Sequence, residues 1–143
     1  MFFKKFEKNI SFKKLTVYWL TFFTIGITLK TIITTFIPSF AISEEELTEE
    51  FCKPINMVEV GLAFFTETML FFILPWKWKG RRGAIVGTSL WILLHFLTKN
   101  IPVGIYIATI GYFYYRCLEI GRWKEIMLFH AITNLPAFLT CFV

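Results

Sequence analysis

The sequence predicts an all-α fold: a polytopic membrane helix bundle of about five transmembrane helices, with the N-terminus inside and the C-terminus outside. Composition is the first reason, because 56% of the 143 residues are hydrophobic and the mean hydropathy is +0.61. One globule of this size cannot hide that much apolar surface. The second reason is that long apolar runs alternate with short charged segments.

Residues 1–14 are predicted to form a basic interfacial segment, with lysines interleaved with phenylalanines as in helices that lie on an anionic leaflet. The remaining residues, 15–143, are predicted to form a single membrane-embedded helical domain. Its first apolar run, 15–42, is interrupted by Lys30. We expect Lys30 either to extend to a headgroup region or to pair with a buried carboxylate such as Glu67.

The later elements follow from the spacing of charges, glycines and prolines. The acidic stretch at 43–54 predicts a solvated loop or a short surface helix, and the second span is expected at 58–76. The basic, glycine-containing stretch 77–83 predicts a turn into a third span at 84–97. Pro102 suits the first turn of the fourth span, 102–115, and a loop at 116–124 leads to the fifth, 125–143.

The distribution of basic residues supports this layout. With the N-terminus in the cytoplasm, the three inner segments hold 12 of the 15 Lys and Arg residues, and the outer loops hold only Lys53 and Lys99. That asymmetry predicts a multi-pass protein of the cell membrane, in contact with the lipid bilayer. A nucleic-acid partner is not expected, because no soluble basic face is available to bind one.

Three ionisable residues fall within the predicted spans: Glu67, His95 and His130. Asn134 follows His130 by four residues and therefore shares its helix face. A carboxylate and an imidazole can activate water, alone or through a metal, and a second imidazole with a carboxamide can stabilise an oxyanion. The same groups could instead hold helices together by hydrogen bonds, or relay protons as in a small transporter.

The segments Trp91-Ile-Leu-Leu-His95 and His130-Ala-Ile-Thr-Asn134, the second preceded by a tyrosine-rich segment from Gly111, resemble the CPBP family. This is the Abi or type II CAAX prenyl endopeptidase-like family of intramembrane proteases. The resemblance implies hydrolysis of peptide bonds in membrane-associated substrates, prenylated ones included. It implies that Glu67 and His95 activate the attacking water, and that His130 and Asn134 line the oxyanion site.

The family's Glu-Glu-xxx-Arg motif is only half present. If Glu67 takes the first place, Thr68 stands in the second and Phe72 in the arginine place; this alignment keeps a base. If Glu67 takes the second place, Thr66 and Phe71 stand in the others.

The cofactor is left open: none is required, but a divalent metal such as zinc would be held by Glu67, His95 and His130. A bundle this short also suggests a homo-oligomer or a partner subunit. A catalytically degenerate binding or immunity-type protein of the same fold remains the alternative to an enzyme.

Overall fold

The computed structural model describes residues 9–37, 62 and 64–139, and these are helical with no strand among them. The predicted all-α class is therefore confirmed for the described part of the chain. The acidic stretch 43–54 and most of the basic segment 1–14 lie outside the described residues.

Helix α1 spans Phe12–Phe36, and the Ser11 side chain caps it by accepting a hydrogen bond from the Lys14 amide. The helix therefore begins inside the stretch predicted as a separate basic segment. Among the described helices, only α1 is by itself long and apolar enough to cross a membrane. Lys30 is exposed on α1 and does not form the ion pair with Glu67 that was one of its two expected roles.

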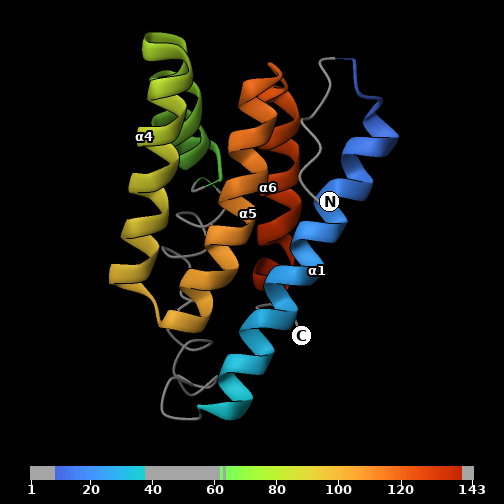
Figure 1. The fold of residues 1–143 in the computed structure, drawn as a ribbon, viewed down its shortest axis with the longest axis vertical. Helices are drawn as coiled ribbons and strands as arrows, with labels where there is room; N and C mark the ends of the chain where they lie inside the picture. Colours follow the sequence, from blue (N-terminus) through green and yellow to red (C-terminus); the bar gives the residue numbers. More distant parts are fainter. Residues whose placement is uncertain (1–8, 38–61, 63, 140–143) are drawn as a thin grey trace.

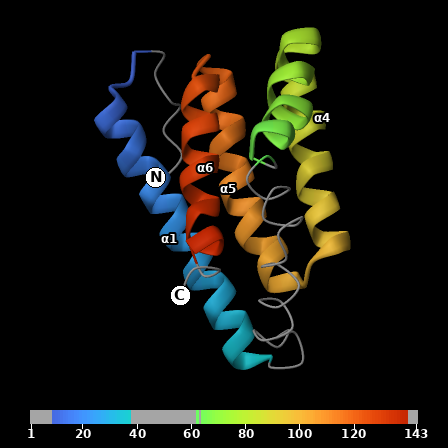
Figure 2. The same ribbon diagram turned by 180° about the vertical axis from the view of Figure 1, so that it is seen from behind.

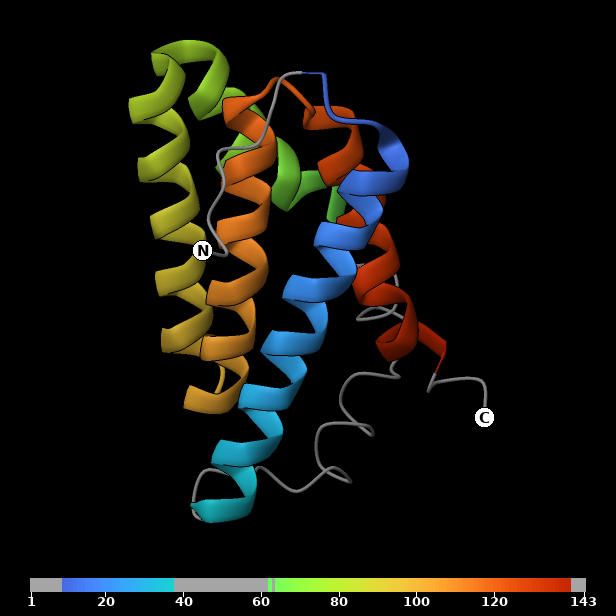
Figure 3. The same cartoon turned by 45° about the vertical axis from the view of Figure 1, so that its right-hand side comes forward.

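The next part of the chain is a helical hairpin. A helix that includes residues 64–67 continues as the π-helix η2, Thr68–Ile73, and then as α4, Leu74–Thr98. Within α4, Gly80 adopts φ 55° and ψ −133°, and there the chain turns back on itself (Figure 3). A positive φ is accessible to glycine at little cost, so the turn predicted at 77–83 is confirmed as a kink at one residue.

Two further glycines let the arms of this hairpin touch. A Cβ atom on Gly83 would lie 1.8 Å from the Pro75 carbonyl oxygen, and one on Gly87 would lie 1.9 Å from that of Phe71. Both distances are far below van der Waals contact. Only hydrogen at these positions allows the second arm to pack directly on the backbone of the first.

The last two helices are joined by a tight turn. Helix α5, Ile101–Glu119, has Pro102 in its first turn as predicted, and Asn100 caps it by accepting from the Val103 amide at 2.9 Å. Gly121, with φ 77°, reverses the chain into α6, Trp123–Leu139.

Helix α5 is the centre of the bundle. It packs against α1 on one side and α4 on the other, while α6 and η2 complete the assembly (Figures 1 and 2). The core is mostly aromatic: Phe129 of α6 stacks on Trp19 of α1 at 5.2 Å between ring centroids and meets Phe113 of α5 edge-on at 5.6 Å. Such pairs contribute about 0.5–1.5 kcal/mol each beyond simple burial.

Helices α1 and α6 begin at the same end of the bundle, where α5 ends and α4 turns (Figure 1). Most of the basic residues of the described chain belong to these segments. Arg122 donates to the Ile10 carbonyl oxygen at 2.6 Å and so joins the start of α6 to the residues before α1. Arg81 donates to the Tyr115 hydroxyl and lies 3.2 Å from Glu119, which joins the α4 turn to α5. The hydrogen bond to Tyr115, with help from Glu119, raises the pKa of Arg81 above its usual value.

The close approach of the hairpin arms predicts that Gly87→Ala is destabilising. The new methyl group would meet a backbone carbonyl that cannot rotate away, so the arms must separate, at a cost of about 1–3 kcal/mol or more. We expect a lower midpoint of thermal unfolding in detergent micelles. Gly26→Ala is the matched control, because its nearest neighbour at 2.9 Å is the edge of the Tyr106 ring, a side chain that can move. Equal midpoints for the two variants would contradict the close packing.

Candidate functional site

A polar cluster lies between the hairpin and α6, with Glu67 at its centre. The Glu67 Oε2 atom accepts a hydrogen bond from Trp91 Nε1 at 2.6 Å and lies 3.7 Å from His130 Nε2. The Glu67 side chain is 28% exposed, whereas that of His130 is 4% exposed. No described residue is hydrogen-bonded to Glu67 Oε1. One carboxylate oxygen is thus held by the protein, and the other is left available.

The protonation pattern of His130 follows from its neighbour Thr68. The Thr68 hydroxyl donates its single proton to the Phe64 carbonyl oxygen, since a carbonyl can only accept. His130 Nδ1 lies 3.0 Å from the same hydroxyl oxygen and must therefore donate to it. In neutral His130 the proton is then on Nδ1, and Nε2 turns a lone pair toward Glu67.

The π-helix explains why Glu67 and Thr68 face the same cluster. It begins directly after Glu67, and its wider turn brings Thr68, Phe72 and Ile73 to the buried side. Single π-turns inside α-helices occur frequently at functional sites. No feature of the apolar run 58–76 predicted this one.

His95 does not pair with Glu67 as the sequence led us to expect. Its Nδ1 atom lies 2.8 Å from the Trp91 carbonyl oxygen and must donate to it, so this imidazole is turned toward its own helix. The Trp91 ring lies against both imidazoles, with ring centroids 4.7 Å from His95 and 5.5 Å from His130. The histidine beside Glu67 is His130, and the role of His95 in activating water stays a prediction.

Asn134 lies one turn beyond His130 on α6 and is partly exposed. Its side chain takes part in none of the side-chain hydrogen bonds among the described residues of α6. The hydroxyl of Thr133 donates to the Phe129 carbonyl oxygen at 2.7 Å and lies 3.4 Å from the Tyr114 hydroxyl. The carboxamide of Asn134 is therefore available to a ligand. The N–H group of neutral His130, which was expected to bind the oxyanion together with Asn134, is already hydrogen-bonded to Thr68.

The described residues contain no group of three His, Cys, Asp or Glu side chains close enough to hold a metal ion. Glu67, His95 and His130, the set that a metal would have required, do not converge. The reason is the orientation of His95, whose Nδ1 is engaged by its own backbone, with the Trp91 indole packed against both imidazoles.

Sequence reasoning missed the roles of Trp91 and Thr68. The Trp91 indole N–H donates to Glu67, which the other aromatic side chains without an N–H, such as phenylalanine, could not do. The signal in the sequence was a tryptophan, an aromatic residue with an N–H donor, one helical turn before His95. Thr68 could not be distinguished from Thr66, because only the fold shows that Thr68 is buried and Thr66 exposed.

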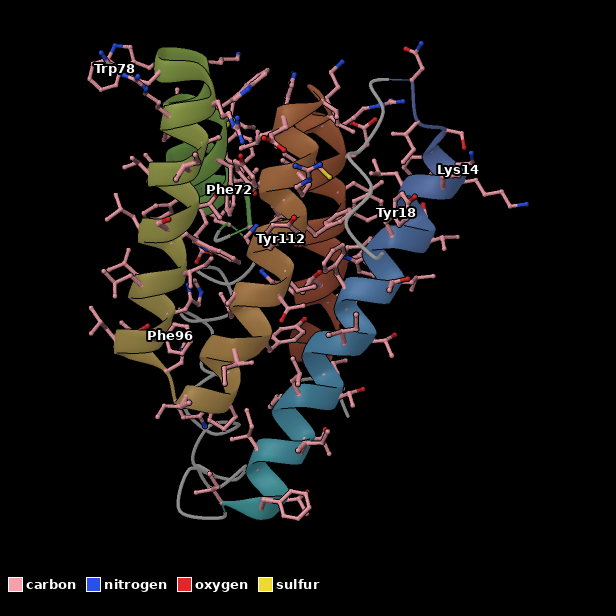
Figure 4. The ribbon with its side chains drawn as sticks, viewed as in Figure 1. Lys14, Tyr18, Phe72, Trp78, Phe96 and Tyr112 are labelled. Carbon is pink, nitrogen blue, oxygen red and sulfur yellow. The ribbon has the colours of Figure 1, made fainter. Side chains whose placement is uncertain are left out.

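Phe72 closes one side of the polar cluster. Phe72, in the arginine place, is fully buried; its ring centroid is 5.1 Å from that of Trp91 and 5.4 Å from that of Tyr114. Figure 4 shows Phe72 directed into the bundle from the hairpin. Its ring forms an apolar wall beside the polar cluster.

Comparisons with known proteins do not identify a relative: no protein-family model matches the chain, no curated protein matches its sequence, and no solved structure matches its fold. The described residues form an all-helical bundle with a partly buried carboxylate–imidazole pair.

The hydrogen bond from His130 Nδ1–H to Thr68 predicts that Thr68→Val changes the tautomer of His130. The isosteric change removes the acceptor for Nδ1–H, so the imidazole proton can move to Nε2 and bond to Glu67. We expect the nitrogen-15 NMR signals of His130 to report this change of tautomer. Leaving a buried donor without its partner typically costs 1–3 kcal/mol. The control is Thr66→Val on the same helix, where an exposed threonine donates to the Leu62 carbonyl oxygen. An unchanged His130 spectrum in Thr68→Val would refute the assignment.

Proposed function

We propose that the chain is a multi-pass membrane protein in which the described helices cross the bilayer together. The apolar surface supports this proposal. Large hydrophobic side chains are exposed on every described helix, among them Leu20, Leu93, Ile101 and Leu128. Water would penalise such a surface, whereas lipid would not.

The charged end of the bundle supports an orientation. Basic side chains of the α4 turn, the end of α5 and the start of α6 lie together with those at the start of α1, while Lys99 lies at the other end. Under the positive-inside rule, the basic end faces the cytoplasm. The N-terminus is then inside, and α6 runs outward.

This orientation predicts the labelling of single cysteines introduced after Cys52, Cys117 and Cys141 are replaced by serine. Trp78→Cys lies at the basic end and should react with a membrane-impermeant maleimide only from the cytoplasmic side. Lys99→Cys should react only from the opposite side, and so controls for leaky vesicles. Labelling of both positions from one side would exclude the arrangement.

We further propose that the polar cluster hydrolyses peptide bonds of membrane-associated substrates, as the resemblance to the CPBP family suggests. The observation that carries the proposal is the pair of acceptors, Glu67 Oε2 and neutral His130 Nε2, facing each other at 3.7 Å. Two lone pairs that face each other repel unless a donor beside them bonds to both. A water molecule can donate one proton to each across this distance, and would thereby be oriented for attack.

In the proposed reaction, the water oxygen attacks the substrate carbonyl carbon while one of its protons passes to the Glu67–His130 pair. The C–N bond then breaks, and the same pair returns the proton to the leaving amine. The Trp91 N–H holds the carboxylate in place, and Thr68 keeps the lone pair of His130 directed at the water. Asn134 is the remaining candidate donor to the oxyanion, and His95 supports the Trp91 wall rather than acting as the base.

A catalytically degenerate binding protein of the same fold is the second candidate, and Phe72 favours it. A fully buried ring occupies the place where the family motif has arginine, and threonine replaces the second glutamate. In that case the Glu67, Trp91 and His130 contacts would serve to hold helices together.

The hydrolytic proposal predicts that Glu67→Gln abolishes cleavage. The probes are two fluorescence-quenched peptides in liposomes: one has a prenylated cysteine near its C-terminus and the other is a plain transmembrane peptide. A positioned general base contributes roughly 10²–10⁴-fold, so kcat should fall by about that factor in Glu67→Gln and His130→Ala. Glu125→Gln is the matched control, because Glu125 pairs with Arg122 outside the cluster.

The outcomes separate the two candidates. Cleavage by wild type and Glu125→Gln, but not by the two cluster variants, supports the enzyme. Equal inactivity of all four chains on both peptides, with each chain folded by its thermal midpoint, supports the binding protein.

A further inference from the structure

An apolar groove runs along the outer face of the hairpin, away from the polar cluster. Its volume is about 560 Å³, within the range of roughly 300–1,000 Å³ that is typical of ligand clefts. Leu70, Leu74 and Val86 form much of its wall, and Trp78, Lys79 and Arg82 lie at the end near the Gly80 turn. The groove is thus apolar along its wall and basic at the end near the Gly80 turn, which we call its mouth.

The side chains at the mouth are free to meet a ligand. Trp78 is 80% exposed and, as Figure 4 shows, projects away from the bundle at the turn. Lys79 Nζ lies 4.8 Å from the Trp78 ring centroid. Within the described part of the chain, no carboxylate forms an ion pair with Lys79 or Arg82, whereas the adjacent Arg81 is engaged by Tyr115 and Glu119.

The length of the groove suits an amphipathic molecule. Leu70 and Trp78 are eight residues apart on nearly continuous helix, which separates them by roughly 12 Å along the axis. An acyl chain could lie along Leu70, Leu74 and Val86 while its headgroup reaches the cations. Tryptophan is enriched at the depth of lipid headgroups, the position that Trp78 would then occupy.

We propose that this groove binds one anionic phospholipid of the cytoplasmic leaflet, with an acyl chain against its apolar wall and its phosphate between Lys79 and Arg82. Charge complementarity identifies this occupant: a neutral lipid would leave two unpaired cations at the mouth, and a soluble anion would leave the wall uncovered. The proposal rests on membrane insertion at the orientation given above. It does not depend on peptide hydrolysis.

The test uses the full chain in detergent micelles with equal concentrations of phosphatidylglycerol and phosphatidylcholine, and native mass spectrometry counts the retained lipid. Wild type should retain one phosphatidylglycerol in preference. Each basic residue near an anionic surface contributes roughly fivefold, so Lys79→Gln with Arg82→Gln should lower that preference by about 30-fold. The matched control removes two exposed cations at the same end of the bundle, Lys13→Gln with Lys14→Gln.

A second variant tests the apolar wall while keeping the charges. Val86 is 57% exposed, so Val86→Trp can fill the groove without disturbing the core, and retention of both lipids should fall. If both double variants lost the preference for phosphatidylglycerol equally, general surface charge would explain the preference, and the proposal would be overturned. So would a wild type without lipid preference, or a second copy of the chain in place of lipid.

Discussion

The contact of Glu67 with Trp91 and His130 is the constraint on which the site depends. A partly buried carboxylate is costly unless hydrogen-bond donors satisfy it, and Trp91 supplies one at 2.6 Å. The Thr68 hydroxyl accepts a hydrogen bond from the Nδ1–H group of His130. Neutral His130 therefore has no second N–H to donate to Glu67. The two groups therefore lack a hydrogen-bond donor between them, and a water molecule or a substrate can supply it.

Glycines, which have no side chain, allow the hairpin to bring these groups together. Gly80 reverses the chain, and Gly83 and Gly87 let the second arm approach the backbone of the first. The π-turn of η2 then directs Thr68 and Phe72 inward beside Trp91. The two sides of the same hairpin differ in chemistry: the inner side carries the polar pair, and the outer side carries an apolar groove with a basic mouth.

Much of the helical layout could be read from the sequence, because glycine, proline and charge act locally. The turn at Gly80 and the start of α5 at Pro102 fell where the residues predicted them. The site was only partly predictable. Glu67 and His130 do meet, whereas the sequence had placed His95 with Glu67. Which imidazole faces Glu67 depends on the rotation of each helix about its axis, and residue spacing does not determine that rotation.

The sequence by itself determined that the protein is strongly apolar and that its described part is helical, with most of the basic residues in the segments that meet at one end. Composition and the spacing of charges decide those properties. Only the tertiary structure decided which polar groups are neighbours. The tautomer of His130, the donor role of Trp91 and the division between Thr66 and Thr68 depend on a π-turn and on close backbone contact. These are set by packing between segments distant in the chain, and no local pattern encodes them.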